Sequence, residues 1–340
     1  MPSEATPRAD NKAHAPVIIL NWNGWEDTFH CLRSLSLDPE VGEVWLVDNG
    51  SRDDRSSEAF ALCPGLRVLR LDNNYGYAGG YNRALKLASK EGVEFAYLLN
   101  NDSTVVPGFL SALVRIASAN GRIAAAGSLV LYAEPSNFVQ FDGTYHGPGA
   151  RPLYEDSGVR IAHMVAGSGM LVRLRAMEEC GYFDERFFCY CEEAEWCFRV
   201  RDHGLLCVYC ADSAIIHKGQ SSDLNSNAMY YRFRNPFLLF ERLSKETRKA
   251  EARKLKYEAA VVAEVARRSG RLQEWISIAH GLHDGLVGKT GPRPSRSVSL
   301  IPALRLALLS LKAHLHDKWQ SLWGNQPGYG KPLRVWDPGW

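Results

Sequence analysis

The sequence predicts an α/β fold with a central, mostly parallel sheet flanked by helices. Two observations lead to this expectation. Short apolar runs alternate with segments of helical periodicity through the first half of the 340-residue chain, a pattern typical of a sheet that is covered on both faces. The composition, with 46% hydrophobic and 23% charged residues, is that of a globular protein and excludes a disordered or fibrous chain.

The first half of the chain is expected to hold four strands and three helices. Each strand is a short apolar run, and each helix has apolar residues at three- and four-residue spacing. The strands are Pro16–Asn21, Glu43–Asp48, Leu66–Leu71 and Glu94–Leu99, and the helices are Gly24–Leu35, Ala78–Lys90 and Pro107–Ala119. Ligands bind beyond the carboxyl ends of such strands, so a site is expected in the polar segments that follow them.

The second half of the chain extends this sheet and then becomes helical. Its expected elements are strands at Ile123–Leu131, Met164–Val172, Leu206–Cys210 and Ala214–Ile216, a helix at Glu192–His203, and helices at 226–244, 246–268, 271–285 and 300–316. These patterns divide the chain into a flexible N-terminal segment, a main domain and a C-terminal helical extension, covering 1–15, 16–222 and 223–340.

The formal charge of +2 conceals an uneven distribution. Residues 1–222 hold 20 Lys and Arg against 28 Asp and Glu, whereas residues 223–340 hold 20 against 10. A net charge so close to zero argues against a nucleic-acid partner. The basic extension, above all its segment Leu300–Leu315, is suited either to an anionic inner-leaflet membrane surface or to helix packing and homo-oligomer formation.

The sequence contains neither a recognisable signal peptide nor an uninterrupted apolar run long enough to span a membrane. A cytoplasmic protein is therefore expected, peripheral on the inner face of the plasma membrane if the extension binds lipid. Its eight cysteines are then reduced. Only Cys207 and Cys210 have zinc-like spacing, in a run typical of a buried strand, so apolar core cysteines are favoured over a zinc site.

Three polar segments follow the expected strands of the first half. Asp48 can accept hydrogen bonds from a ribose or a base, or it can cap the turn after its strand. Asn74–Asn82 places three glycines at the start of a helix, where backbone N–H groups can approach a phosphate or a sugar. Asp102, with Asn100 two residues earlier, suits a hard divalent ion, although an Asn-rich helix cap would have the same sequence.

Two further segments carry candidate chemistry. Glu192 and Glu193 open a helix in an aromatic and apolar setting, which raises a carboxyl pKa toward the range of a general base. Acidic residues at a helix start can also serve only as partners of the helix dipole. His217 ends a strand, and it becomes a metal ligand only where the fold brings it to Asp102.

Together and in this order, these segments resemble family 2 glycosyltransferases of the GT-A fold, and more narrowly bacterial rhamnosyltransferases that build O-antigens and cell-wall linkers. The similarity extends over about Val17 to Arg296. It is carried by VDNGS at 47–51, NYGYAGGYN at 74–82, LNND at 99–102, GSGMLVR at 167–173, GYFDERFFCYCEEAEWCFR at 181–199, HKGQSS at 217–222, YYRFRN at 230–235 and GLHDGL at 281–286.

The resemblance implies a metal-dependent, inverting hexosyltransferase and a role for each matched position. The nucleotide and the donor sugar would be bound by Asn21, Asn23, Asp48, Gly79, Gly80, Asn82 and Asn101. Mg²⁺ or Mn²⁺ would be bound at the D-x-D position by Asp102 with Asn100, and His217 would complete the coordination. Glu193, with Glu192 as the alternative, would be the general base.

Two positions depart from the family pattern. Asn100 replaces the first acid of D-x-D, which weakens the expected metal site, and Glu193 stands where the family usually has Asp. The expected donor is a dTDP- or UDP-sugar, with dTDP-L-rhamnose foremost. The expected acceptor is a hydroxyl of a glycan or of a polyprenyl-diphosphate-linked molecule in cell-envelope polysaccharide synthesis.

Two other functions stay open at this point. One is a sugar-nucleotide pyrophosphorylase, which is disfavoured because Asn21–Trp25 lacks the basic residue that grips a triphosphate. The other is a non-catalytic sugar-nucleotide-binding protein.

Overall fold

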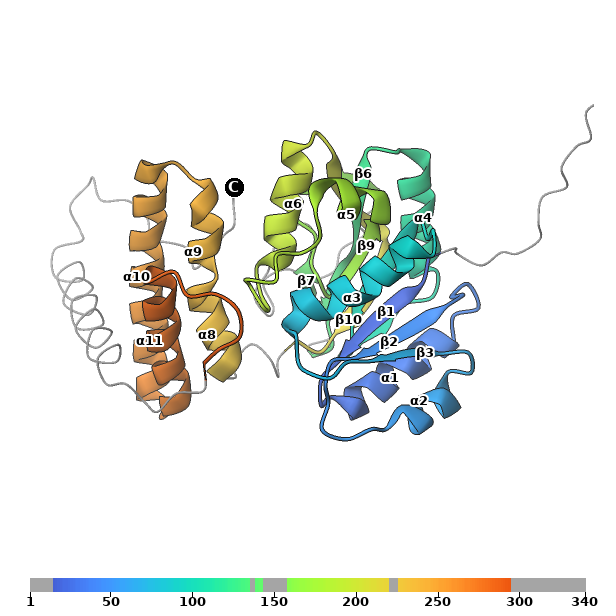
Figure 1. Ribbon diagram of the computed structural model, residues 1–340, viewed down its shortest axis with the longest axis horizontal. Helices are drawn as coiled ribbons and strands as arrows, with labels where there is room; N and C mark the ends of the chain where they lie inside the picture. Colours follow the sequence, from blue (N-terminus) through green and yellow to red (C-terminus); the bar gives the residue numbers. More distant parts are fainter. Residues whose placement is uncertain (1–14, 135–137, 143–157, 220–225, 295–340) are drawn as a thin grey trace, which may run out of the picture. The chain divides into compact units, whose positions relative to one another are not determined.

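A computed structural model describes residues 15–134, 138–142, 158–219 and 226–294 (Figure 1). Their contacts group the chain into two compact units, each of which is described by itself. The first unit comprises the chain up to Asn74, Gly80–Tyr182 and Trp196–Lys218. The second comprises Tyr75–Gly79, Phe183–Glu195 and the chain from Gly219 onward. The expected domain boundary near residue 222 stays a prediction, but two segments that precede it group with the C-terminal helices.

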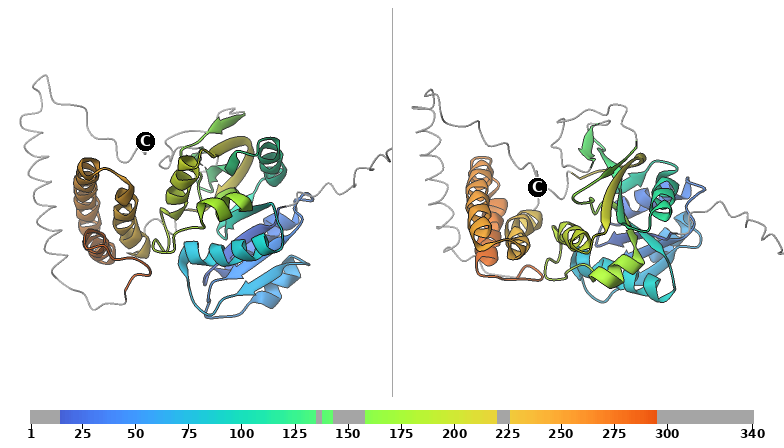
Figure 2. Two further views of the ribbon diagram at one scale, coloured as in Figure 1. Left: turned by 45° about the horizontal axis from the view of Figure 1, so that its top comes forward. Right: turned by 90° about the horizontal axis from the view of Figure 1, so that it is seen from above.

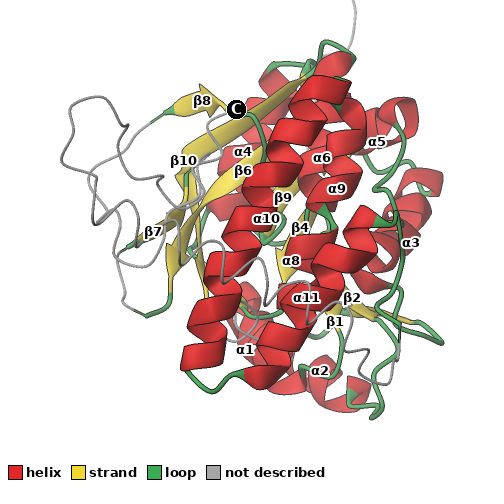
Figure 3. Ribbon diagram, turned by 90° about the vertical axis from the view of Figure 1, so that its left-hand side faces the viewer, coloured by secondary structure: helices red, strands yellow, loops and turns green. Residues whose placement is uncertain are grey.

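The described part of the first unit is built on a ten-stranded sheet with the order β3-β2-β1-β4-β9-β6-β10-β5. Strand β7 pairs with β6, and β8 pairs with β10, as Figure 3 shows. The bounds are β1 (Val17–Asn21), β2 (Val44–Asp48), β3 (Arg67–Arg70), β4 (Phe95–Asn100), β5 (Ser103–Val105), β6 (Ile123–Tyr132), β7 (Val139–Phe141), β8 (Val159–Ile161), β9 (Gly169–Arg173) and β10 (Leu206–His217).

Helices cover both faces of this sheet, as the alternating pattern predicts. Apolar side chains of α1 (Trp25–Ser36), α2 (Ser56–Leu62) and α4 (Phe109–Ala119) share a buried cluster with Val17 and Ile19 of β1. Helix α3 (Gly76–Lys90) approaches the other face of β1, where a Cβ atom on Gly80 would lie 2.5 Å from Leu20 Cδ1. The bounds of the remaining helices that carry first-unit residues are α5 (Leu174–Cys180) and α6 (Glu192–Asp202).

The fold class is confirmed, and the sheet is mixed in its second half. Strands β1 to β4 run parallel, whereas β9 runs antiparallel to both β4 and β6. Strand β7 returns beside β6 after a short connection, and such a connection permits only antiparallel pairing. The sequence pattern does not indicate β5, β7, β8, α2 or α5, because elements of three to seven residues are too short to show a period.

The two strands expected at Leu206–Cys210 and Ala214–Ile216 form the single strand β10, with a shift of register between Cys210 and Ala214. Cys207 and Cys210 lie on its regular part and are fully buried. Residues three apart on a strand point to opposite faces, so these two thiols face away from one another. Both are packed as small core side chains, in agreement with the interpretation that the sequence favours.

The described part of the second unit is mainly helical. Its elements are α8 (Ser226–Arg234), α9 (Pro236–Leu239), the 3-10 helix η1 (Phe240–Arg242), α10 (Lys245–Arg268) and α11 (Leu272–Leu286). Figure 2 shows α10 beside α11 in two views, and their shared apolar core includes Phe233 of α8, Ala259 of α10 and Ile278 of α11.

Two features set the bounds of these helices. Pro236 cannot donate a backbone hydrogen bond, which splits the helix expected over 226–244. Ser244 caps α10 by accepting a hydrogen bond from the backbone N–H of Thr247. None of the helices within the described ranges is long and apolar enough to cross a membrane. The helix expected at 300–316 lies outside the described residues.

Gly281 tests the packing of α11 on α8. A Cβ atom at this position would overlap the backbone carbonyl of Tyr230, which cannot move aside without displacing α8. We expect Gly281→Ala to lower the free energy of unfolding by about 1–3 kcal/mol, despite the helix-favouring effect of alanine. The control is Gly121→Ala, where a Cβ atom meets nothing within 4 Å. Equal melting temperatures for the two variants, measured by circular dichroism, would contradict this packing.

Candidate active site

The carboxyl ends of β1, β2 and β4 meet at one edge of the sheet. In the parallel register, Asn21 at the end of β1 pairs with Asp48 on β2, and Leu20 pairs with Asn100 on β4. The polar residues that follow these strands therefore gather in one place, as the sequence predicts from the parallel topology.

Asp48 is completely buried, and one of its carboxylate oxygens has no hydrogen bond. Oδ1 accepts from the backbone N–H of Ser51 at 3.2 Å and from Asn21 Nδ2 at 3.4 Å. Oδ2 lies 3.4 Å from Arg70 Nη1 but accepts no hydrogen bond. Leaving a buried carboxylate oxygen unsatisfied is unfavourable, so this atom is ready to accept a proton donor from a ligand.

Asn21 is a support for Asp48. Its Nδ2 also donates to Ser51 Oγ at 3.2 Å, while its Oδ1 accepts from Gly24 N at 3.0 Å and from Thr28 Oγ1 at 3.1 Å. Both donors and both acceptor positions of the amide are thus used within the protein, and the side chain is fully buried. Direct contact of Asn21 with a nucleotide stays a prediction; the structure shows that it positions Asp48 and Ser51.

Asn23 and Asn101 fix the loop that follows β1. Asn23 has a left-handed backbone with φ 56°, and its Oδ1 accepts from the backbone N–H of Arg52 at 2.9 Å. Asn101 Nδ2 donates to Gly24 O and to Thr28 Oγ1, both at 3.1 Å. A Cβ atom on Gly24 would lie 2.6 Å from Asn101 Nδ2, so a larger residue at this position would displace the Asn101 amide. A binding role for Asn23 or Asn101 stays a prediction.

The glycines at 76–80 lie in helix α3 itself. The helix begins at Gly76, two residues earlier than expected, so Gly79 and Gly80 form part of its first turns. Asn82 follows in the same helix and is buried. Gly80 permits α3 to approach β1, as described above, and its Cβ position also lies 3.2 Å from Asn49 Nδ2. Donor binding by Gly79, Gly80 and Asn82 stays a prediction.

Asp102 and His217 are brought together from distant parts of the sequence. Asp102 Oδ1 lies 3.1 Å from His217 Nε2, and Asn100 Nδ2 lies 3.4 Å from the same nitrogen. The contact arises because β5, which begins directly after Asp102, pairs with β10 so that Ser103 lies opposite His217. The condition that the sequence sets for His217 as a metal ligand is therefore met.

Gln140, on the short strand β7, sets the proton position on His217. The buried Gln140 Oε1 lies 2.8 Å from His217 Nδ1 and accepts its proton, which leaves Nε2 as the ring nitrogen that faces Asp102. The sequence offers no signal for Gln140, because β7 has only three residues and gives no periodic pattern. Gln140 is the polar support that histidine ligands of metal ions ordinarily have.

The side chains at this edge that could bind a metal ion are few, but they suit a divalent ion. Burial opposes ionisation of Asp102, yet the hydrogen bond and the charge of His217 outweigh it and lower the pKa of Asp102 below its usual value of 3.8. Within the described residues, no three His, Cys, Asp or Glu side chains form a metal-binding group. Sites for Mg²⁺ commonly use one or two carboxylates and take the remaining ligands from substrate phosphates and water.

The carboxylate pair lies in the second unit. Glu192 is buried, Glu193 is half-buried, and in each the Oε2 atom is buried without a hydrogen bond. Burial, reinforced by the charge of Glu193, raises the pKa of Glu192 well above its usual value of 4.5, and Arg234 opposes this effect. Burial also raises the pKa of Glu193. The expected apolar setting is thus present, and both carboxyls are shifted toward the range of a general base.

The loop before this pair has a strained backbone. Phe188, Tyr190 and Cys191 have φ angles of 66°, 69° and 74°, in the left-handed region that residues with a side chain avoid at roughly 1–2 kcal/mol each. Such conformations persist only where the surrounding structure enforces them, and they concentrate at functional sites.

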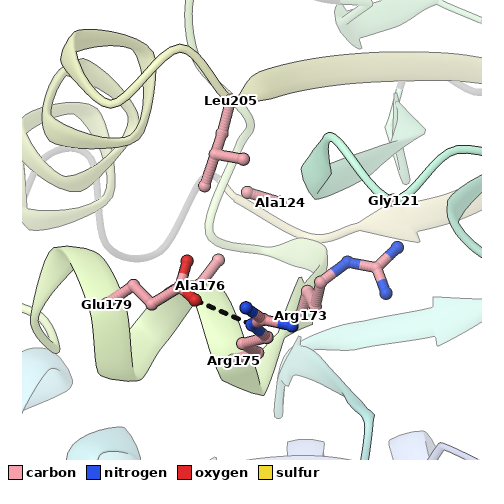
Figure 4. A pocket seen from close by; sticks show the side chains of 7 residues that line it. All are labelled: Gly121, Ala124, Arg173, Arg175, Ala176, Glu179 and Leu205. Atoms are coloured by element: carbon pink, nitrogen blue, oxygen red, sulfur yellow. Dashed lines mark hydrogen bonds and ion pairs between the residues drawn. The ribbon is translucent and has the colours of Figure 1, made fainter.

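A pocket of the first unit lies away from the strand ends described above (Figure 4). Its walls include Arg173, at the end of β9, which pairs with Phe95 at the start of β4. The pocket is thus at the opposite edge of the sheet. It is lined by Gly121, Ala124, Arg173, Arg175, Ala176, Glu179 and Leu205, and it contains none of the predicted site residues.

The fold is that of the GT-A glycosyltransferases. A solved structure of GalNAc-T7 with UDP, GalNAc and Mn²⁺ has a similar fold, with a TM-score of 0.51 and 15% sequence identity. The match covers 67% of this chain and 51% of that one, so this chain spans about half the length of that structure. Residues 17–181 match the model of glycosyl transferase family 2.

Two curated relatives show which members of family 2 this chain is similar to. The N-acetylglucosaminyl-diphospho-decaprenol L-rhamnosyltransferase of Mycobacterium tuberculosis is 28% identical over 230 residues, which are 59% of this chain and 75% of that protein. The low-salt glycan biosynthesis hexosyltransferase Agl10 of Haloferax volcanii is 29% identical over 233 residues, 65% of this chain and 74% of that one. The predicted resemblance to rhamnosyltransferase-like members of family 2 is confirmed.

The raised pKa of Glu192 makes stability depend on pH. Between pH 4.5 and the higher pKa of the folded state, the unfolded chain releases this proton while the folded chain retains it, so the free energy of unfolding falls as pH rises. We expect Glu192→Gln to remove this decrease, by about 1.4 kcal/mol for each unit of pKa shift. The variant is then more stable than the wild type at pH 8, and the difference shrinks toward pH 4.5.

Thermal unfolding between pH 4.5 and pH 8 measures this effect. Glu246→Gln is the control, because Glu246 is exposed in the first turn of α10, where loss of the charge is slightly destabilising at neutral pH. A stability gap between Glu192→Gln and the wild type that does not grow with pH would contradict the raised pKa.

Proposed function

We propose that this protein is an inverting glycosyltransferase that uses a divalent metal ion to move a hexose from a nucleoside diphosphate to an acceptor hydroxyl. The observation that carries the proposal is the meeting of Asp102 Oδ1 with His217 Nε2, at 3.1 Å, beyond the carboxyl end of β4. The match of residues 17–181 to glycosyl transferase family 2 supports the reaction class.

The donor and acceptor follow from the relatives. Similarity to an L-rhamnosyltransferase that is named for a polyprenyl-diphosphate-linked acceptor favours dTDP-L-rhamnose as donor and a lipid-linked glycan as acceptor. With such an acceptor, the proposed location of the protein is the cytoplasmic face of the membrane, and its proposed role is in cell-envelope polysaccharide synthesis. The segment Leu300–Leu315, which is proposed to contact the membrane surface or a second copy of the chain, lies outside the described residues.

The residues at the edge of the sheet have separate proposed roles in donor binding, one group for the metal ion and another for the nucleoside. Asp102 and His217, with the Asn100 amide turned to present its oxygen, would hold Mg²⁺ or Mn²⁺. The bound ion would neutralise the charge that develops on the departing diphosphate. Asp48 Oδ2 would accept a hydrogen bond from the nucleoside, and Asn21 keeps that carboxylate in place.

Glu193 is the proposed general base, and the neighbouring Glu192 is the alternative. Glu193 is the more exposed of the two, so its carboxylate has the better access to an acceptor. It would take the proton of the acceptor hydroxyl as that oxygen attacks the anomeric carbon. The bond from this carbon to the diphosphate oxygen breaks in the same displacement, which inverts the anomeric configuration.

The metal site is tested by Asp102→Ala. Loss of the carboxylate removes a ligand and the charge that favours the ion, so we expect Mn²⁺-dependent binding of dTDP or UDP, measured by calorimetry, to be lost. Transfer falls by at least about 100-fold, because charge neutralisation of this kind is worth several kcal/mol.

Asp212→Ala is the matched control, since Asp212 lies on β10, the strand that carries His217, but is exposed and lies 3.8 Å from Arg115. Metal-dependent nucleotide binding that survives Asp102→Ala, together with wild-type transfer, would remove Asp102 from the site. Release of pyrophosphate from a nucleoside triphosphate and a sugar phosphate would instead identify a pyrophosphorylase.

The base is tested by comparing Glu193→Gln with Glu192→Gln. A general base contributes about 10²- to 10⁴-fold, so Glu193→Gln is expected to lower kcat by that factor while the KM for the donor changes little. Because the pKa of Glu193 is raised, the acid limb of the wild-type pH–rate profile lies above pH 4.5. If Glu192→Gln shows the larger loss, the two assignments are exchanged; if neither variant loses activity, the pair is not the base.

A further inference from the structure

The loop Phe187–Cys191, which leads into the Glu192–Glu193 pair, is held by a buried asparagine that follows α8. Asn235 Nδ2 lies 3.1 Å from Phe187 O, 2.6 Å from Cys189 O and 2.6 Å from Tyr190 O. The side chain is fully buried. An amide nitrogen carries two hydrogens, which suffice for Cys189 O and Tyr190 O, and the more distant Phe187 O also accepts from Arg234 Nη2. Those carbonyls can converge on one point only while the backbone keeps its left-handed turns.

Arg234, the last residue of α8, holds the same loop from the neighbouring position. Its Nη2 donates to Phe187 O at 2.7 Å and to Gly291 O at 3.0 Å, and its Nη1 donates to Arg186 O and Lys289 O, each at 3.2 Å. The guanidinium therefore ties the loop to the segment after α11. Only the planar fork of arginine reaches four carbonyls at once; a lysine ammonium cannot.

Two further contacts in the second unit press on this loop. The ring of Tyr231, on α8, stacks on Phe188 with centroids 5.3 Å apart and an interplanar angle of 20°. Ala78 N donates to Phe188 O at 3.2 Å, and a Cβ atom on Gly76 would overlap that same carbonyl. Phe188, whose φ angle is 66°, is thus held by contacts with both its side chain and its backbone.

We infer that Arg234 and Asn235 are positioning residues, which keep the strained loop in its left-handed conformation and thereby fix the carboxylates of Glu192 and Glu193. The inference rests on the proposed function, in which this pair supplies the general base. The C-terminal helical extension then has a part in catalysis, because α8 and the segment after α11 supply the groups that hold the loop.

The experiment replaces each group by the variant that changes its shape least. Asn235→Asp substitutes an oxygen for the donating nitrogen, and Arg234→Lys keeps the charge but loses the fork. A displacement of about 1 Å at a reacting group lowers the rate by roughly 100-fold. We expect a loss of kcat of that order for Asn235→Asp, with donor KM and Mn²⁺-dependent nucleotide affinity within about threefold of the wild type. The controls are Asn120→Asp and Arg253→Lys, both at exposed positions.

The loop contains its own reporters, which need no activity. Cys189 and Cys191 lie within it, and burial raises the pKa of each thiol, so both should react slowly with N-ethylmaleimide. Release of the loop in Asn235→Asp is expected to speed their alkylation by at least about tenfold, as read by mass spectrometry. Cys63, in the first unit, is the internal control and keeps its rate, which shows that the first unit of the variant is folded.

A conformational rescue separates positioning from general destabilisation. Cys191→Gly removes the Cβ atom from one left-handed residue. The double variant with Asn235→Asp is therefore expected to have a kcat at least about threefold higher than that of Asn235→Asp alone. Unchanged alkylation of Cys189 in Asn235→Asp would overturn the inference. Faster alkylation with wild-type kcat would overturn it equally. A third outcome is that Asn235→Asp still speeds alkylation but the wild-type protein transfers no sugar. That outcome would overturn the proposed function, and with it the catalytic role of Arg234 and Asn235.

Discussion

The register of β1 between β2 and β4 is the constraint on which the donor side of the site depends. It places Asn21 beside Asp48 of β2, and it places Leu20, the residue before Asn21, beside Asn100 of β4. Asn21 then uses its whole amide to join the turn after β2 to the start of α1, and Asn101 draws the turn after β4 toward the same helix. A one-residue slip of β1 would turn these side chains to the other face of the sheet and separate the three turns.

Carboxylates in the two units have opposite electrostatic surroundings. Asp102 has a histidine partner that keeps it ionised, which suits a cation ligand. Glu192 and Glu193 lie beside one another, and burial raises the pKa of both carboxyls, which favours their protonated forms. The same functional group is therefore adapted to hold a charge in one place and to exchange a proton in the other, and the difference follows from neighbours alone.

Much of this architecture is legible in the sequence. The four parallel strands, α1, α3, α4 and the long helices α10 and α11 have strong periods, and the polar strand ends identify Asp48, Asp102 and His217. Gln140 gives no signal because its strand is three residues long. Arg234 and Asn235 can be noticed only as part of YYRFRN, since their partners are backbone carbonyls some 45 residues away, and backbone atoms leave no trace in a sequence. The saturation of Asn21 by protein groups is likewise visible only in three dimensions.

The connection between the loop at 187–191 and Asn235 has a consequence for the order in which the protein is made. A ribosome emits the chain from its N-terminus, so the strained loop leaves the exit tunnel before α8, and well before Gly291. Until those later residues emerge, the loop lacks the hydrogen bonds of Arg234 and Asn235 that hold its unfavourable backbone angles. The nascent sheet can complete its parallel strands while the carboxylate loop is still unformed. Translation of the last helices is thus the step that would complete the catalytic machinery, and a nascent chain that could already bind its nucleotide would not yet be able to use it.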